Sequence, residues 1–430
     1  ILTRGAVDLY ALFEWGLTII CYIFILSCIG GKKMDIYTDI KRLASQLKIS
    51  NFSIPEIRVE KNAILHIREL IKRKQWKNIV VVYDQNTYLA AGEKLIKFLM
   101  NDFEEVIGIN INENEHGQVI ANEESLVQVF IKTPNDADVL IAVGSGTIHD
   151  IVRFAGHKMN IPFISVPTAA SVDGFTSNGA PLILRGVKQT IQTAAPIAVF
   201  ADIDVIKAAP REMAAAGFGD ILGKYTSLLD WEISKLVGNE PFHEGAASLT
   251  RKALETCVEY VEEISNADEK GITILMNALI ESGLVMQILD YSRPASGAEH
   301  HLSHYWEMYL LKTNQKQLLH GAKVGVATTM IVELYKKNWK KLLRSERIKN
   351  TVYGNGIEQY GEYIFSVIEK LPSQDELKKL LEKVGGPTTV EELGIPQEIV
   401  IESLNEAHHL RDRCTGLLLL NQIKETPIWL

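Results

Sequence analysis

The chain has 430 residues, of which 47% are hydrophobic and 23% charged, and its formal net charge is −8 at pH 7. The composition is that of a globular protein, and the length predicts two domains. The acidic balance argues against nucleic acid as a partner, because a phosphate backbone requires clustered Lys and Arg.

The four cysteines are scattered along the chain, and none forms a Cys-x-x-Cys pair. A zinc ribbon or a thioredoxin-like motif therefore has no support, and this usage is typical of a reducing cytoplasm. We expect a cytoplasmic protein.

Residues 1–33 form a hydrophobic N-terminal extension. From Leu9 to the residue before Lys32 the sequence is apolar for about one membrane thickness, with Glu14 as the one interruption. The segment is either a membrane anchor or upstream sequence outside the native fold, with Met34 opening an amphipathic helix. We favour the second interpretation, so a membrane is an expected partner only if these residues belong to the native protein.

Between residues 54 and 206 short apolar runs alternate with amphipathic helices. Near-continuous apolar strands separated by helices predict a parallel sheet covered on both faces. We therefore predict an α/β domain over residues 34–206. The predicted strands are 78–84, 106–111, 137–146, 161–168 and 196–202.

From residue 207 onward the pattern predicts helices alone, and we expect an all-helical domain over residues 207–430. An α/β domain followed by a helical one leaves a cleft between them, which is where we expect the active site. The main predicted helices are 211–237, 243–265, 270–290, 299–312 and 320–340.

Two strand-to-helix turns are rich in small residues. The first, Gly144-Ser145-Gly146, precedes a helix that opens with Thr147, so its backbone N–H groups could approach a phosphate. It lacks the third glycine of the dinucleotide fingerprint, and the strand-end acid Asp84 precedes it instead of following it. The second turn, 165–181, carries hydroxyl groups and one acid, which favours a pocket lining. Both turns in one sheet favour a nucleotide site.

Three histidines, His300, His301 and His304, lie within five positions. On a helix the first and third share a face, and His301 points away. His320 and Asp220 each stand beside glycines at the starts of other predicted helices. One Asp and two His from three helices are typical of a catalytic divalent-metal site; a helix-surface or core role for each histidine is the alternative.

Five segments in order resemble the glycerol-1-phosphate dehydrogenases, in particular the bacterial AraM type. This family belongs to the iron-containing alcohol dehydrogenase and dehydroquinate synthase-like superfamily. The resemblance extends from about residue 54 to "HHLRDRCTGLLLLN", and it implies a nucleotide-binding α/β domain, a helical metal-binding and substrate domain, and a homodimer. The segments are "VGSGTIHD", "PTAASVDGFTS", "AAGFGDILGKYTSLLDWEIS", "SRPASGAEHHLSH" and "LHGAKVG".

The resemblance also assigns roles to individual residues. The implied metal ligands are Asp220, His300 and His320. The implied cofactor contacts are Gly144, Ser145, Gly146 and Asp150 at the pyrophosphate, Thr168 and Ser171 at the nicotinamide half, and Asp84 at the adenosine ribose. Thr147 and Ser177 are implied cofactor contacts as well. The implied substrate contacts are Asp173, which we also take as catalytic, and Asp220.

The implied reaction is reversible hydride transfer between NAD(H) and C2 of dihydroxyacetone phosphate, giving sn-glycerol 1-phosphate. NADP(H) is less favoured, because a carboxylate at the ribose repels a 2′-phosphate. One Ni²⁺ or Zn²⁺ ion would polarise the C2 oxygen.

His304, one turn from His300, is the candidate for proton delivery, and support of the metal ligand is its alternative role. Three cations inside the motifs are candidates for the substrate phosphate, with ion pairing as the alternative role: Lys224, Arg293 and Lys323. Three rival functions stay open: a polyol dehydrogenase without a phosphate pocket, a dehydroquinate-synthase-like lyase, and a membrane-tethered binding protein with an idle site.

Overall fold

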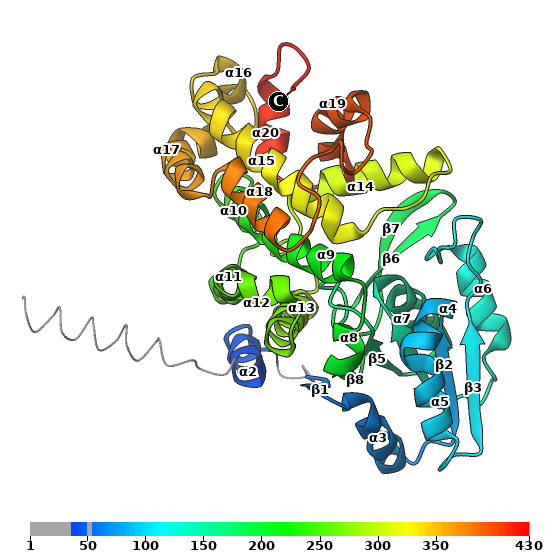
Figure 1. The fold of residues 1–430 in the computed structure, drawn as a ribbon. Coiled ribbons are helices and arrows are strands. Elements are labelled where there is room, and N and C mark those ends of the chain that lie inside the picture. Colours follow the sequence, from blue (N-terminus) through cyan, green and yellow to red (C-terminus); the bar gives the residue numbers. More distant parts are fainter. Residues whose placement is uncertain (1–35, 50–53, 430) are drawn as a thin grey trace, which may run out of the picture.

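The computed structural model describes residues 36–49 and 54–429. The predicted extension over 1–33 lies outside these residues. An α/β half is followed by a helical half, and every described element after residue 202 is a helix (Figure 1). The predicted fold class is confirmed.

The central sheet has six strands, all parallel, in the order β1-β8-β5-β4-β2-β3. Strands β4, β5 and β8 are buried at every position, which accounts for their continuous apolar sequences. The five predicted strands are confirmed. β1 was not predicted, because its charged residues alternate at a half-exposed edge. The strands are β1 (Glu56–Glu60), β2 (Asn78–Tyr83), β3 (Glu105–Asn110), β4 (Val139–Gly144), β5 (Phe163–Pro167) and β8 (Ala198–Asp202).

Helices cover both faces of this sheet, as its sequence pattern predicts. Ile79 and Val81 of β2 face a core with α3 and α5, and the alternating Val80 and Val82 face a core with α6 and α7. Strands β2 and β4 are neighbours, but the chain continues from β2 to β3 on one side of the pair and from β4 to β5 on the other. The carboxyl ends of β2 and β4 therefore form the topological switch point, where ligands bind in such sheets. The helices here are η1 (Ala63–His66), α3 (Ile67–Lys74), α4 (Gln85–Thr87), η2 (Tyr88–Gly92), α5 (Glu93–Leu99), α6 (Glu123–Lys132) and α7 (Gly146–Met159).

An antiparallel hairpin, β6 (Gly179–Leu184) with β7 (Val187–Gln192), lies between the sheet and helix α14 (Figure 1). Its two-residue turn places Arg185 and Gly186 at φ 51° and 74°, the left-handed conformation that tight hairpins require. This hairpin was not predicted from the sequence, since Arg-Gly is not one of the usual turn pairs.

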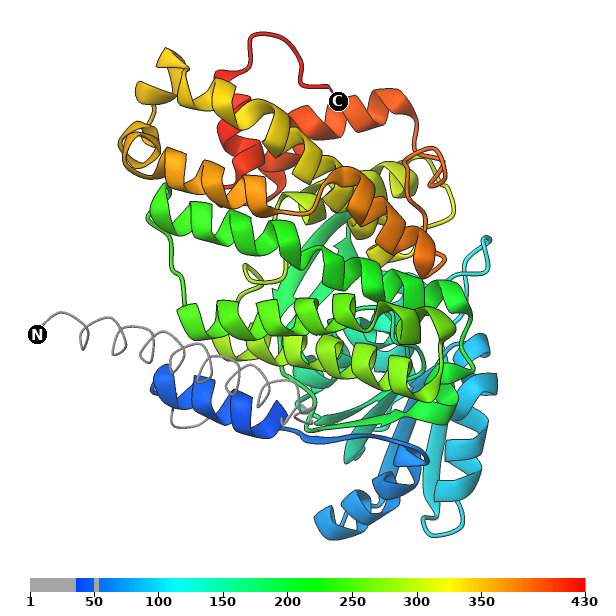
Figure 2. The same cartoon turned by 60° about the vertical axis from the view of Figure 1, so that its left-hand side comes forward.

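The helical half consists of long helices stacked in layers (Figure 2). The predicted helix 211–237 is two helices that meet at Gly223, and 243–265 is two that meet at Tyr260. The helices are α8 (Ile203–Lys207), α9 (Arg211–Leu222), α10 (Lys224–Leu236), α11 (Glu244–Glu259), α12 (Val261–Asn266), α13 (Glu269–Leu289), α14 (Ala298–Lys312), α15 (His320–Leu343), α16 (Glu346–Lys349), α17 (Gly354–Lys370), α18 (Gln374–Lys383), α19 (Gln397–Glu406), η3 (Ala407–Leu410) and α20 (Gly416–Ile423).

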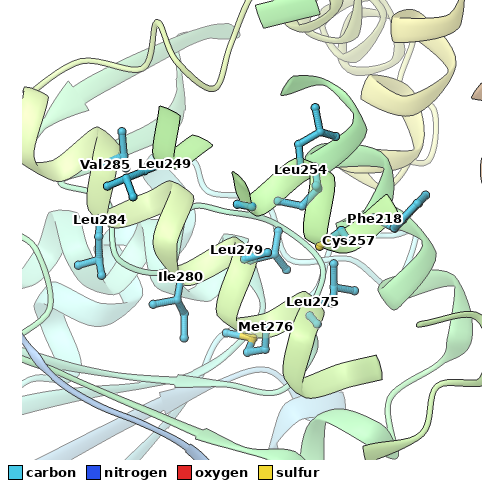
Figure 3. Close-up of a cluster of buried hydrophobic side chains, with 14 of the residues drawn as sticks. Phe218, Leu249, Leu254, Cys257, Leu275, Met276, Leu279, Ile280, Leu284 and Val285 are labelled. Carbon is cyan, nitrogen blue, oxygen red and sulfur yellow. The ribbon is translucent and has the colours of Figure 1, made fainter. Parts of the chain in front are cut away.

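Helix α13 contributes Leu279 to a buried apolar cluster that also contains Phe218 of α9 and Leu254 of α11 (Figure 3). It is the one helix, among the residues that the structure describes, long and apolar enough to span a membrane, and most of that apolar stretch is buried here. Helix α2 (Ile36–Gln46) buries Ile36 and Ile40 in the same core. The predicted domain division groups α2 with the sheet; the helix packs on α11 and α13, and the hydroxyl of its Tyr37 accepts from the backbone N–H of Ile57 in β1 at 2.6 Å.

Replacing Glu281 by Gln is expected to stabilise the protein at alkaline pH. Glu281 lies inside α13 with no exposed surface, and neither carboxylate oxygen has a hydrogen-bond partner within the described ranges. Burial raises the pKa of Glu281 to about 7. The fold therefore favours the protonated acid, and this stability is present below the ordinary glutamate pKa and is lost as pH rises through about 7.

The stability advantage of the Glu281→Gln variant should grow by roughly 2–3 kcal/mol from pH 5 to pH 8. Chemical unfolding at the two pH values measures it. Glu255→Gln, at an exposed position of α11, is the matched control and should show no such growth. Equal pH dependence in wild type and Glu281→Gln would contradict a buried, titrating Glu281.

Candidate functional site

A cavity of about 470 Å³ opens between the two halves at the carboxyl edge of the sheet. Its walls come from both halves: the start of α7, the loop 171–179, the β6–β7 hairpin, the starts of α14 and α15, and the segment 411–413. This is the predicted cleft, and the cavity brings together segments that are far apart in the sequence.

The turn after β4 forms one end of the cavity. Ser145, Gly146 and Thr147 line it, and they present the N-terminus of α7 to whatever the cavity holds. Gly144 lies behind them, and a Cβ at this glycine would stand 2.7 Å from Cβ of Ile148. The turn is therefore tight enough to bring backbone N–H groups to the cavity wall.

Asp150 also lines the cavity, and its Oδ1 accepts a hydrogen bond of 2.7 Å from Nη1 of Arg153. Burial raises the pKa of Asp150 to about 7, with Arg153 opposing the shift. Arg153 is fully buried and donates to the carbonyl oxygens of Gly174 and Gly179. It thus fastens the second turn to α7, a positioning role that the sequence analysis missed.

In the second turn Ser171, Asp173 and Ser177 line the cavity. Thr168 does not, but its backbone N–H donates to the carbonyl of Gly144 at 3.0 Å and ties the two turns together. The hydroxyl of Ser171 is buried and has no hydrogen-bond partner among the described residues, so it is free to contact a ligand.

Asp84 follows β2 at the same edge of the sheet, outside the cavity wall. Its Oδ1 accepts from the backbone N–H of Thr87 at 2.8 Å, and the Thr87 hydroxyl accepts from the Asp84 N–H at 3.0 Å. Asp84 therefore caps the short helix α4 with one carboxylate oxygen and retains the other for a ligand.

The predicted metal ligands lie together. Asp220 of α9, His300 of α14 and His320, the first residue of α15, bring their ligand atoms within 4.8 Å of one another. Nε2 of His300 is 3.5 Å from Oδ1 of Asp220. A tetrahedral ion with bonds of about 2.1 Å separates its ligand atoms by roughly 3.4 Å, so these residues fit one divalent metal.

Neighbouring groups orient two of these ligands. Nδ1 of His300 lies 2.7 Å from the carboxylate of Glu299, which fixes the ring and leaves Nε2 for a metal. The backbone N–H of Asp173 donates to Oδ2 of Asp220 at 3.0 Å, which turns Oδ1 toward His300, with Nζ of Lys224 3.4 Å from the same oxygen. Burial opposes ionisation of Asp220, but Lys224 and His300 hold its pKa below the ordinary value.

Burial lowers the pKa of His320 to about 3, so its ring is neutral and can donate a lone pair.

Glu299, which orients His300, had not been predicted as a site residue. Its carboxylate is held by the Thr226 hydroxyl at 2.6 Å and the Gly297 N–H at 2.6 Å, contacts that its sequence position does not reveal.

A second group, His304, Glu307 and His320, also has ligand atoms within 4.8 Å. Its carboxylate is already engaged, because Oε2 of Glu307 lies 2.7 Å from Nζ of Lys188 and 3.2 Å from Nζ of Lys323. A metal ion here would stand beside two ammonium groups. The electrostatics therefore favour the first group.

His304 lines the cavity, with its ring centroid 6.1 Å from that of His300 and 5.7 Å from that of His320. Burial lowers the pKa of His304 well below its usual range, so the ring is neutral at pH 7. His301, which the helical spacing excluded from the ligand set, is fully buried and does not line the cavity.

Two of the predicted phosphate contacts are badly placed for that role. Lys224 is fully buried, and its Nζ is bound to Asp173 at 2.7 Å, to the Ala295 carbonyl at 3.3 Å and to Asp220 at 3.4 Å. Arg293 pairs with Glu240 and does not line the cavity. Lys323 does line it, but it shares Glu307 with Lys188.

Three cations of the cavity wall had not been predicted as site residues: Lys188, Arg411 and Arg413. Lys188 lies in the hairpin that the sequence analysis missed. The two arginines lie in the "HHLRDRC" stretch, whose alternation of basic and acidic residues resembles a solvated surface in sequence.

Residues 58–210 match the model of the iron-containing alcohol dehydrogenase family. Solved structures share the fold. One is glycerol dehydrogenase from Schizosaccharomyces pombe, which is 20% identical with a TM-score of 0.63 and covers 86% of this chain and 88% of its own. Another is a sulfoacetaldehyde reductase from Bifidobacterium kashiwanohense in complex with NAD+, which is 15% identical with a TM-score of 0.60. The match covers 85% of this chain and 95% of the reductase. The chain therefore has the fold of the iron-containing alcohol dehydrogenases.

Curated relatives narrow the class. The chain is 48% identical to glycerol-1-phosphate dehydrogenase [NAD(P)+] of Geobacillus thermodenitrificans over 86% of this chain and 93% of the relative. The glycerol-1-phosphate dehydrogenase [NAD(P)+] of Bacillus subtilis strain 168 is 47% identical over 86% of this chain and 92% of the relative. That of Pyrococcus horikoshii is 38% identical over 83% of this chain and 90% of the relative. The chain belongs to the glycerol-1-phosphate dehydrogenase family.

Proposed function

We propose that the protein interconverts dihydroxyacetone phosphate and sn-glycerol 1-phosphate by hydride transfer at C2, with NAD(H) as the favoured cofactor and one Ni²⁺ or Zn²⁺ ion. The observation that carries this proposal is the convergence of three features in one cavity. They are the start of α7, the ligand group Asp220, His300 and His320, whose two histidines line the cavity, and the basic side chains of the cavity wall. The names of the curated relatives support the same reaction.

A bound divalent metal would supply Lewis-acid polarisation of the substrate oxygen at C2, and NAD(H) would supply or accept the hydride. Asp220, His300 and His320 would hold the metal, and the start of α7 would hold the cofactor pyrophosphate. His304, which is neutral and lies one turn beyond His300, is placed to accept the C2 hydroxyl proton in the oxidative direction and to return it in the reductive one.

Asp173 is placed to orient the substrate. Its Oδ2 accepts hydrogen bonds from Lys224 at 2.7 Å and from the Ser282 hydroxyl at 2.8 Å, so the carboxylate cannot swing. The residue lines the cavity beside the metal ligands and can accept a hydrogen bond from a substrate hydroxyl.

The test uses the full chain loaded with metal and mixed with NADH and dihydroxyacetone phosphate. One NADH should be consumed for each sn-glycerol 1-phosphate formed, and unphosphorylated dihydroxyacetone should react far more slowly. Faster oxidation of NADH with the unphosphorylated ketone would instead favour a polyol dehydrogenase. Folded, metal-loaded protein that consumes no NADH with either ketone would contradict the proposal and favour a lyase or a binding protein.

Asp84→Asn is expected to narrow the preference for NADH over NADPH by roughly tenfold, because it removes a negative charge from the expected position of the ribose. The asparagine oxygen can still accept from Thr87, so the cap on α4 is kept. The kcat/KM ratio for the two cofactors measures the effect. Asp84→Ala, which loses both the charge and the cap, is the companion variant. An unchanged ratio in both variants would remove Asp84 from the cofactor site.

A further inference from the structure

The cavity contains two pairs of basic side chains that differ in their acidic partners. Lys188 and Lys323 share the carboxylate of Glu307, at 2.7 Å and 3.2 Å. Arg411 and Arg413 line the same cavity, and across residues 36–49 and 54–429 neither forms an ion pair. The first pair is partly neutralised by the protein, and the second is not.

The backbone directs both arginines to one side. Arg411 has extended backbone angles, φ −140° and ψ 139°, and the N–H of Arg413 donates to the carbonyl of Arg411 at 3.1 Å. This hydrogen bond closes a three-residue turn centred on Asp412, and the arginine side chains on both sides of the turn line the cavity. Asp412 is accordingly exposed and lies outside the cavity wall.

Each guanidinium is held to a different wall by one hydrogen bond. Nη2 of Arg411 donates to the hydroxyl of Thr190 in the hairpin at 3.1 Å, and Nη1 of Arg413 donates to the carbonyl of Ser296. Ser296 lies four residues before the metal ligand His300. A guanidinium has five N–H donors, so most of these donors remain for a ligand in the cavity.

An unpaired guanidinium inside a protein is costly unless an anion joins it. Burial, together with the neighbouring Arg411, lowers the pKa of Arg413 to about 10, so it is still a cation at pH 7. Burial also lowers the pKa of Arg411 from its ordinary value. A phosphate monoester carries up to two negative charges and oxygens that accept from guanidinium groups in pairs, which matches two arginines better than a lysine pair already sharing one carboxylate.

We infer that Arg411 and Arg413 bind the phosphate group of the substrate and so select a phosphorylated ketone over its unphosphorylated counterpart. The identity of that substrate rests on the proposed function, whereas the anion site rests on the two arginines alone. Lys224 and Arg293, the cations that the sequence motifs had suggested, have no comparable access to the cavity.

The experiment compares the full-length variants Arg411→Met and Arg413→Met with Arg347→Met, an exposed arginine of α16 that serves as the matched control. Binding of inorganic phosphate alone is measured by calorimetry with and without NADH. In a second assay, kcat and KM are determined for dihydroxyacetone phosphate, for dihydroxyacetone and for NADH.

Loss of one charged hydrogen-bond partner should weaken phosphate binding by roughly 10- to 100-fold. The KM for dihydroxyacetone phosphate should rise by a similar factor. The kcat/KM for dihydroxyacetone phosphate, divided by that for dihydroxyacetone, should fall by a similar factor. The KM for NADH and all properties of Arg347→Met should stay near wild type. Arg411→Lys and Arg413→Lys keep the charge without the paired donors, so they should lose less phosphate affinity than the Met variants. These Lys variants serve as the test if the Met variants fail to fold.

Two results would overturn the inference. One is that the arginine variants keep the wild-type phosphate affinity and the wild-type ratio of kcat/KM for the two ketones, while Lys188→Met loses both. The other is a rise in the KM for NADH instead of the ketone phosphate, because the arginines would then serve the dinucleotide. If wild type binds phosphate through the arginines but does not reduce the ketone phosphate, the anion site stands and the proposed reaction fails.

Discussion

His320→Ala is expected to abolish tight binding of a divalent metal and to lower kcat/KM for dihydroxyacetone phosphate by roughly 10³-fold. His320 lies at the first position of α15, where its ring centroid is 5.1 Å from that of His300. The metal-to-protein ratio after dialysis against limiting Ni²⁺ or Zn²⁺ measures the binding independently of activity.

His304→Gln and Glu307→Gln are the controls that separate the two candidate metal groups, because both groups contain His320. Both variants should retain about one metal per chain if Asp220, His300 and His320 hold the ion. Loss of metal from these two variants, with retention in Asp220→Asn, would move the ion to the second group.

Gly321→Ala is expected to destabilise the fold by about 3 kcal/mol or more and to lose the metal as well. A Cβ on Gly321 would lie 1.8 Å from the carbonyl oxygen of Ala216, and one on Gly219 would lie 2.3 Å from the carbonyl oxygen of Gly321. Helices α9 and α15 therefore touch backbone to backbone. Asp220 and His320 stand beside this contact, so separating the helices also separates two metal ligands.

Thermal unfolding and metal content of Gly321→Ala measure the two effects. Gly386→Ala is the matched control: a Cβ there would have its nearest neighbour at 3.5 Å, and its backbone is not in the left-handed region. A Gly321→Ala protein with the melting temperature and metal content of wild type would show that the contact between the helices is not needed to assemble the site.

The parts of the fold that could be predicted are those in which one local pattern decides the structure. The continuous apolar sequence of β4 is explained by burial on both faces, and its alternation with helices predicts the parallel sheet. β1 and the hairpin escaped because their residues are half-exposed and carry no usual turn signal. The packing of α2 on α11 and α13 joins segments more than two hundred residues apart, which periodicity cannot detect.

The candidate site divides in the same way. The helical spacing of His300 and His304 and the glycines beside Asp220 and His320 indicated residues that the fold does bring together. The phosphate contacts could not be chosen from sequence, because Lys224 and Arg413 are both basic residues inside recognisable segments. Only tertiary structure shows that Lys224 is paired with Asp173, whereas Arg413 forms no ion pair with any residue that the structure describes. The homodimer stays a prediction.

The most direct test of the account is a metal titration of the metal-stripped full-length protein in the presence of NADH and dihydroxyacetone phosphate. Oxidation of NADH should be negligible without metal, should rise in proportion to added Ni²⁺ or Zn²⁺, and should level off near one ion per chain. Full activity without metal, or no oxidation of NADH at any metal content in folded protein, would contradict a metal-dependent dehydrogenase of the ketone phosphate.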